Sequence, residues 1–194
     1  MPAGSKTLYL TFDDGPVYGP TEFVLETLRD FKAKATFFCI GDNIIKHPKV
    51  FQQIIDEGHG IGNHTYNHLN GSNTSLSVYL QNIQECQFII EGKRKDGKSG
   101  NMYPLFRPPY GRISRDQRQA LSDYHIIMWD ELRLDFDKNL SSKQLLQSTI
   151  SATRDGSIIV FHDSLKAEKH LHTVLPRFMA HFASLGYTFR SITV

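Results

Sequence analysis

Short apolar segments rich in β-branched and aromatic residues alternate along the chain with amphipathic stretches. These segments predict strands near residues 7–12, 35–40, 59–63, 104–108, 125–130, 157–162 and 187–193. Most of the stretches between them carry apolar residues at the three-to-four-residue spacing of a helix. Such alternation, without internal repeats or low-complexity linkers, predicts a mostly parallel sheet. About seven strands favour a distorted (β/α) barrel over a doubly wound sheet, so the expected fold class is α/β.

Residue types that favour helix ends mark the expected helix boundaries. Helix starts are expected where proline or serine precedes an amphipathic stretch, at Pro20, Pro48, Ser75, Ser114 and either Ser141 or Ser142. Gly58 is expected to end the second of these helices. A last helix is expected over residues 170–185, with His170 and His172 exposed to solvent.

The length and charge of the chain exclude several classes of protein. A chain of 194 residues fits one domain with a sizeable core. Its 22 basic and 20 acidic residues give a net charge of +2, so no overall field attracts nucleic acid or anionic lipid. No apolar run has the length of an integral membrane span, and the amino terminus lacks a secretory apolar segment. We therefore expect a soluble protein, with a signal peptide in a natural precursor left open.

The two cysteines do not predict a disulfide. Cys39 lies within a predicted strand and Cys86 within a predicted helix, both among apolar residues. Buried free thiols are the expected state for such positions.

Two adjacent carboxylates, Asp13 and Asp14, end the first apolar run in the segment Thr-Phe-Asp-Asp-Gly-Pro. Like charges at the rim of a core need neutralisation, most simply by a cation on one and an arginine on the other. The segment Asp-Gly-Pro is also ordinary turn chemistry, so the hexapeptide alone leaves both interpretations open. In a parallel α/β sheet, however, chemistry gathers at the carboxyl ends of the strands.

The histidines His64 and His68 follow the third predicted strand at a spacing that can bring two imidazoles to one cation. With Asp14 they would form a facial set of ligands that leaves positions open for water and a substrate oxygen. Zinc is the default inference. Cobalt, manganese, nickel and iron also accept histidine and carboxylate ligands, and the sequence does not choose among them.

Two further strand ends carry polar residues that suit catalysis. Arg107 is followed by consecutive prolines and Tyr110, so it can hold a carboxylate rigidly or serve as a structural ion-pair partner. His162 ends the sixth predicted strand, where a proton donor is needed, although a lone buried histidine is usually structural.

Taken together, these four segments resemble motifs of the polysaccharide deacetylase family, the NodB-homology domain of carbohydrate esterase family four. The resemblance spans the chain from residue 7 to its end. It implies a distorted barrel and metal-dependent hydrolysis of an acetyl group from a carbohydrate, in a secreted or cell-envelope protein. Residues 1–6 would be a terminal extension or an engineered start, and residues 7–194 a single catalytic domain.

The resemblance also implies roles for individual residues. Asp14, His64 and His68 would hold the cation, and Asp13, oriented by Arg107, would be the general base. Two further groups would act on the reacting amide, the backbone N–H of Tyr110 on the oxyanion and His162 as the acid for the leaving nitrogen.

The chain departs from the family in the motif around Trp129. Leu132 stands where the family often has the aspartate that tunes the acid histidine. Candidates to replace that aspartate are Asp130, Glu131 and Asp135, and strand alternation does not say which of them points inward. Trp129 and Val160 could line a small pocket for the acetyl methyl group, with core packing as the alternative for both.

We therefore expect a hydrolase that removes N-acetyl groups from a glycan containing N-acetylglucosamine, such as peptidoglycan, chitin or an exopolysaccharide. The same site could serve an O-acetyl esterase acting on xylan. A glycan-binding module that has lost turnover is a third interpretation, although a pure binder would not need Asp13 and His162.

Overall fold

The structure is a computed structural model that describes residues 6–93, 104–132 and 141–194. Its elements are, in chain order, β1 (Thr7–Asp13), α1 (Pro20–Asp30), β2 (Thr36–Cys39), α2 (Gly41–Lys46), α3 (Pro48–Asp56), β3 (Gly60–Asn63), η1 (Gly71–Asn73), α4 (Leu76–Lys93), β4 (Leu105–Phe106), η2 (Pro109–Gly111), α5 (Arg115–Ala120), β5 (His125–Ile126), β6 (Glu131–Leu132), α6 (Ser142–Ala152), β7 (Ile158–His162), α7 (Glu168–Ser184) and β8 (Thr188–Phe189).

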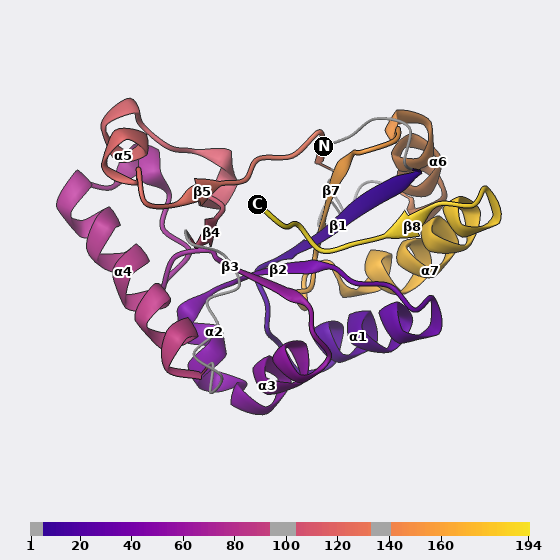
Figure 1. The fold of residues 1–194 in the computed structure, drawn as a ribbon, viewed down its shortest axis with the longest axis horizontal. Coiled ribbons are helices and arrows are strands. Elements are labelled where there is room, and N and C mark those ends of the chain that lie inside the picture. Colours follow the sequence, from indigo (N-terminus) through magenta and orange to yellow (C-terminus); the bar gives the residue numbers. More distant parts are fainter. Residues whose placement is uncertain (1–5, 94–103, 133–140) are drawn as a thin grey trace.

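All eight of these strands belong to one parallel sheet. The strand order is β5-β4-β3-β2-β1-β7-β6, and β8 pairs with the beginning of β1 beside this path. The sheet curls, and helices surround it on its outer side (Figure 1). In the described part of the chain β5 and β6 are the two ends of the order and do not pair with each other. The expected α/β barrel is therefore confirmed as a curled sheet that remains open between these two strands.

The structure has one strand more than the sequence predicts, because residues 125–130 do not form a single strand. The amide of Ile127 donates to Phe106 at 2.8 Å beside β4, whereas the amide of Asp130 donates to Ile158 at 3.1 Å beside β7. The segment therefore crosses from one end of the sheet to the other, along the top of Figure 1. An apolar run alone does not reveal that its two halves pair with different neighbours.

The alternation of side chains along β1 divides the interior into two parts. The even positions pack with the helices in the main apolar cluster: Leu8, Leu10 and Phe12. The odd positions face the inside of the curled sheet: Tyr9, Thr11 and Asp13. The odd face thus leads from an apolar end to a polar end, where the site residues gather.

Most helix boundaries agree with the residues that predicted them. Ser114 and Ser141 cap α5 and α6 by accepting the amides of Gln117 and Gln144, each at 3.2 Å. The short helix α2 was not expected. The expectation of a solvated His170 is wrong: it is 7% exposed, and its Nδ1 lies 2.9 Å from the hydroxyl of Ser142. This contact joins α7 to the start of α6, a tertiary pairing that local sequence does not reveal.

Two further expectations concern the state of the cysteines and the presence of membrane-spanning helices. The thiols of Cys39 and Cys86 are fully buried and, among the described residues, form no disulfide, as expected. Among the described residues, no helix combines the length and the hydropathy that crossing a membrane requires.

One glycine on β3 is required by close packing beneath the site. Gly62 stands opposite Phe38 in the register of β2 and β3. A Cβ on Gly62 would lie 2.4 Å from two carbons of the Phe38 ring, and that ring carries the guanidinium of Arg107 at 4.1 Å. The absence of a side chain at Gly62 therefore leaves room for the ring on which the guanidinium of Arg107 packs.

We expect Gly62→Ala to lower the free energy of unfolding by about 1–3 kcal/mol, because the overpacked ring must shift. Urea denaturation of the metal-free protein measures this change. The matched control is Gly92→Ala, where a Cβ would meet nothing within 4 Å, and which should leave stability unchanged or slightly raised. Equal stabilities of the two variants would show that the ring is not tightly packed.

Burial of His59 makes stability depend on pH. Burial, with the charges of Lys34 and Arg29 added, lowers the pKa of His59 to about 4, so the folded protein holds a neutral ring. Its Nδ1 accepts the amide of Ala35 at 3.3 Å. Because the folded pKa lies below the unfolded value, the contribution to stability is present above about pH 6.5 and is lost as pH falls toward 4.

We therefore expect the free energy of unfolding to fall between pH 6.5 and 4, with about 2 kcal/mol of the loss due to His59. In His59→Gln this part of the fall in the free energy of unfolding with pH should disappear, whatever the substitution does to stability at neutral pH. Urea denaturation at five or six pH values measures the pH dependence for both the wild type and the variant. Parallel curves for the two proteins would contradict the assignment.

Candidate active site

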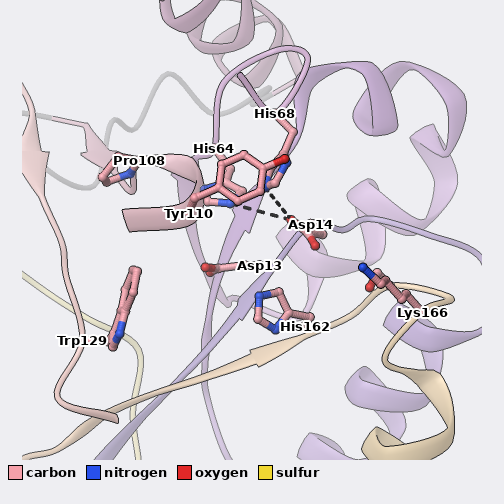
Figure 2. Close-up of a pocket in the computed structure, with 10 residues that line it drawn as sticks. Asp13, Asp14, His64, His68, Pro108, Tyr110, Trp129, His162 and Lys166 are labelled. Atoms are coloured by element: carbon pink, nitrogen blue, oxygen red, sulfur yellow. Dashed lines mark ion pairs between the residues drawn. The ribbon is translucent and has the colours of Figure 1, made fainter. Parts of the chain in front are cut away.

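The residues that the sequence singled out converge at the carboxyl ends of the strands, around a cavity of about 470 Å³ (Figure 2). The cavity is lined by Asp13, Asp14, His64, His68, Pro108, Tyr110, Trp129, His162, Ser164 and Lys166. The two carboxylates come from the end of β1 and the loop after it, and His162 ends β7. Distant segments of sequence thus form one polar floor, as expected for a parallel sheet.

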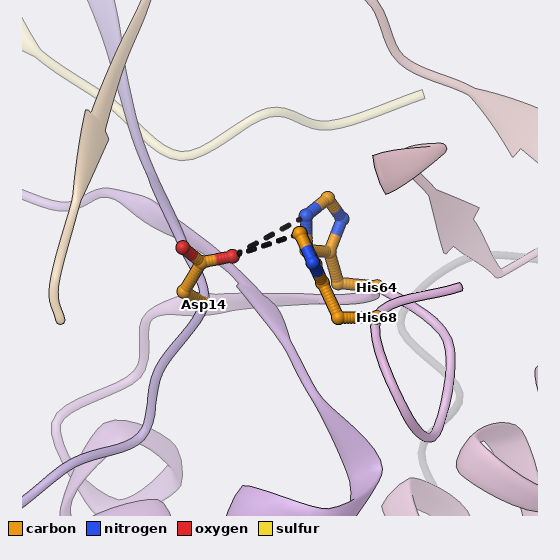
Figure 3. Close-up of side chains that lie close together, drawn as sticks. All are labelled: Asp14, His64 and His68. Atoms are coloured by element: carbon orange, nitrogen blue, oxygen red, sulfur yellow. Dashed lines mark ion pairs between the residues drawn. The ribbon is translucent and has the colours of Figure 1, made fainter. Parts of the chain in front are cut away.

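Asp14, His64 and His68 each present one ligand atom, and these atoms all lie within 4.8 Å of one another. The Oδ1 of Asp14 is 3.2 Å from the Nε2 of His68 and 3.7 Å from the Nε2 of His64 (Figure 3). Both imidazoles therefore present the same nitrogen to the same carboxylate oxygen. One carboxylate and two imidazoles make a donor set that suits zinc and related divalent metals.

The hydrogen bond of His64 determines which of its nitrogens is available. Its Nδ1 lies 2.8 Å from the backbone carbonyl of Arg107, which can only accept, so Nδ1 carries the hydrogen. The lone pair of Nε2 then faces Asp14. Burial lowers the pKa of His64, more than the nearby aspartates raise it, and so favours the neutral imidazole that binds metals.

The electrostatics of Asp14 also fit a cation. Burial alone would raise its pKa, but the close contact with His68 and the charges of the neighbouring histidines outweigh burial, and the pKa is lowered. Its Oδ1 is buried and, among the described residues, has no hydrogen bond of regular geometry. A buried anionic oxygen without a donor, facing two imidazole nitrogens, fits a divalent metal.

Asp13 has a different partner. It is 4% exposed, and its Oδ1 accepts from the Nη1 of Arg107 at 2.8 Å. Arg107 is fully buried, and its Nη1 also donates to the hydroxyl of Thr11 at 2.7 Å, while its Nε donates to the carbonyl of Ile127 at 3.1 Å. The adjacent aspartates are thus separated, since one faces the imidazoles and the other is held by an arginine.

His162 stands directly opposite Asp13 in the register of β1 and β7. It lines the cavity beside the two carboxylates (Figure 2). A histidine beside a carboxylate in a half-enclosed cavity can transfer a proton to or from a bound molecule.

Aromatic side chains form the more exposed rim. The ring of Tyr110 lies 4.6 Å from that of His68, with its backbone in the left-handed region at φ 59°. Trp129 lines the cavity at 5.6 Å from the guanidinium of Arg107. Val160 is fully buried, is not among the residues that line the cavity, and stands opposite Thr11 in the register of β1 and β7.

Three lining residues were not among the candidates from sequence: Pro108, Ser164 and Lys166. Each follows a candidate closely, Pro108 after Arg107 and the other two after His162. The sequence signal that could have identified them is their position just after the carboxyl end of a predicted strand.

Asp130, one of the sequence candidates for a partner of His162, lies at the other end of β7. The Oδ2 of Asp130 accepts the amide of Ile158 at 2.9 Å, at the start of β7, whereas His162 ends the same strand about 13 Å away. Leu132 and Glu131 form β6 beside β7, and Asp135 lies outside the described residues.

Comparisons with known proteins agree with this geometry. A family model described as polysaccharide deacetylase matches residues 1–129. The chain is 32% identical to a peptidoglycan-N-acetylglucosamine deacetylase of Bacillus cereus over 196 residues, covering 100% of this chain and 89% of that protein. It is also 32% identical to chitin deacetylase 2 of Saccharomyces cerevisiae over 163 residues, covering 79% of this chain and 49% of that protein.

A solved structure shares the whole fold. The crystal structure of the Bc1960 peptidoglycan N-acetylglucosamine deacetylase matches with a TM-score of 0.88 at 29% identity. The match covers 98% of this chain and 88% of that chain.

The separation of the two aspartates predicts different effects on metal binding. We expect His64→Ala to weaken zinc binding at least about 100-fold, because a ligand is lost. Asp13→Asn should keep zinc affinity within about threefold, since no zinc ligand is lost and the asparagine oxygen can still accept from Arg107. Isothermal titration calorimetry of metal-stripped protein measures both. Loss of zinc in Asp13→Asn, or its retention in His64→Ala, would contradict the assignment.

Proposed function

The chain belongs to the polysaccharide deacetylase family, and we infer that it is a metal-dependent hydrolase that removes N-acetyl groups from a glycan containing N-acetylglucosamine. The observation that carries this proposal is the pair of adjacent aspartates with separate partners. Asp14 faces two imidazole nitrogens, whereas Asp13 is held by Arg107 at 2.8 Å. Metal-dependent hydrolysis of an amide uses ligands that bind the metal and a separate general base that does not.

We propose that Asp14, His64 and His68 hold the cation and that it is zinc, with cobalt, manganese or nickel as substitutes. When bound, a divalent metal polarises the acetyl carbonyl and lowers the pKa of water. The hydrogen bond from His64 to the carbonyl of Arg107 keeps the imidazole in the orientation and tautomer that this role needs.

Asp13 is the proposed general base. Its Oδ1 is engaged by Arg107, so Oδ2 is the atom that takes a proton from the attacking water. The ion pair fixes the direction of the carboxylate because the guanidinium itself is held by Thr11 and the carbonyl of Ile127. Arg107 is thus a positioning residue for the base.

His162 is the proposed general acid. An amine leaves poorly unless it is protonated, so amide hydrolysis needs a donor distinct from the base. His162 sits opposite Asp13 across the paired strands, which places the acid and the base on neighbouring strands of one floor. The backbone N–H of Tyr110, at the mouth of the cavity, is the proposed donor to the oxyanion of the tetrahedral intermediate.

The rim suits a sugar with an acetyl group. Trp129, Tyr110 and Pro108 add apolar surface beside the polar floor, and sugars present apolar faces that pack on such rings. We propose Trp129 as the side chain nearest the acetyl methyl group. Val160, buried in the sheet, contributes packing behind the floor instead of a direct contact.

Among the candidate glycans we propose peptidoglycan. The support is that relatives named as peptidoglycan N-acetylglucosamine deacetylases match nearly the full chain in both sequence and structure. Chitin is the next candidate. It ranks second because the match to the chitin deacetylase covers a smaller share of this chain than the match to the peptidoglycan deacetylase. A peptidoglycan substrate would place the protein in the cell envelope or outside the cell.

We predict that metal-stripped protein releases no acetate from peptidoglycan or N-acetylated chitooligosaccharides, and that added zinc or cobalt restores release. In zinc-loaded Asp13→Asn, kcat should fall at least about 100-fold with little change in KM. The matched control is Asp116→Asn, at an exposed position on α5, which should retain full activity.

Acetylated xylan is the third substrate in this assay. Release from xylan alone would overturn the N-deacetylase proposal in favour of an O-acetyl esterase. Zinc binding and glycan affinity without acetate release from any of the three would instead indicate a glycan-binding module.

A further inference from the structure

We infer that Asp163, which no step of the proposed reaction uses, is a positioning residue for the metal ligand Asp14. This inference rests on the proposed metal site and adds a residue that supports one of its ligands without binding the metal. Asp163 directly follows His162 at the end of β7 and is fully buried. A carboxyl group in such a place needs a structural reason, because burying it without partners is costly.

The side chain of Asp163 holds the loop that follows Asp14. Its Oδ1 accepts the amide of Gly15 at 3.0 Å, and its Oδ2 lies 2.7 Å from the hydroxyl of Thr21. The same hydroxyl accepts the amide of Val17 at 2.8 Å. One carboxyl group thus fixes the residue after Asp14 and, through Thr21, the next turn of the loop.

The backbone of Asp14 needs such support. Its φ is 80°, in the left-handed region that non-glycine residues adopt only when the surroundings impose it. The carbonyl of Asp14 accepts from the side chain of Asn43 at 2.7 Å, and the carbonyl of Gly15 accepts the amide of Ile40 at 2.9 Å. Asp163 supplies the contact from the opposite side, so the peptide after Asp14 is held between α2 and the end of β7.

The fit between Asp163 and Gly15 is close. A Cβ on Gly15 would lie 2.0 Å from the Oδ2 of Asp163, so only glycine lets the carboxyl group approach the backbone here. The amide of Asp163 also donates to the carbonyl of Asp13 at 3.1 Å. Asp163 therefore contacts the backbone on both sides of the metal ligand.

These contacts survive in either protonation state of Asp163. Oδ1 can accept from Gly15 in both states, and the Thr21 hydroxyl can donate to Oδ2 or accept from it. An asparagine can make the same two contacts, whereas an alanine makes neither. Comparing the asparagine and alanine variants therefore shows whether the two hydrogen bonds, and not the carboxylate charge, are what the site requires.

The test is zinc affinity of metal-stripped protein, measured by isothermal titration calorimetry beside the melting temperature. We expect Asp163→Ala to weaken zinc binding about 10- to 100-fold and Asp163→Asn to restore it to within about threefold of the wild type. Val174→Ala, which opens a cavity in a fully buried part of α7, should lower the melting temperature without changing zinc affinity.

If Asp163→Ala does not fold, Thr21→Val decides the question, because it removes the hydroxyl between Asp163 and Val17. A loss of zinc affinity greater than that in Val174→Ala supports the inference. Wild-type affinity in a folded Asp163→Ala or Thr21→Val protein overturns it. A wild-type protein that binds no zinc would instead overturn the proposed metal site, so the two failures are distinguishable.

Discussion

The buried ion pair between Arg107 and Asp13 is the interaction on which the rest of the site depends. A fully buried guanidinium is tolerated only with its charge and hydrogen-bonding groups satisfied, and removing one partner of such a pair costs several kcal/mol. Arg107 is satisfied by Asp13 and Thr11 on β1 and by the carbonyl of Ile127. The side chain of Arg107 therefore ties β1 to the segment that crosses the opening of the sheet and carries Trp129.

The same arginine contacts both the proposed general base and one of the proposed metal ligands. Its side chain holds the proposed base, and its backbone carbonyl accepts from His64 and so turns the Nε2 of that ring toward Asp14. Asp14 in turn depends on the loop that Asp163 holds from the end of β7. Because the anchors Asp13, Arg107 and Asp163 lie at or directly after the ends of β1, β4 and β7, the sheet sets the distance between the proposed base and the proposed metal ligands.

Much of the site was predictable because strand ends in a parallel sheet converge. Asp13, Asp14, His64, Arg107 and His162 all follow apolar runs, and their polar character at those ends is visible in the sequence. Other features depend on tertiary contacts that no local pattern shows. The division of residues 125–130 between two ends of the sheet and the burial of His170 are of this kind. The supporting role of Asp163 requires knowing that β7 lies beside β1.

The most direct test of this account is the anomalous diffraction of a zinc-loaded crystal, recorded on both sides of the zinc absorption edge. The account predicts one strong peak bonded to Asp14, His64 and His68, with the carboxylate of Asp13 remaining on Arg107 and outside the coordination sphere. A peak bonded to Asp13, or one located away from these three residues, would contradict the separation of base and metal ligand.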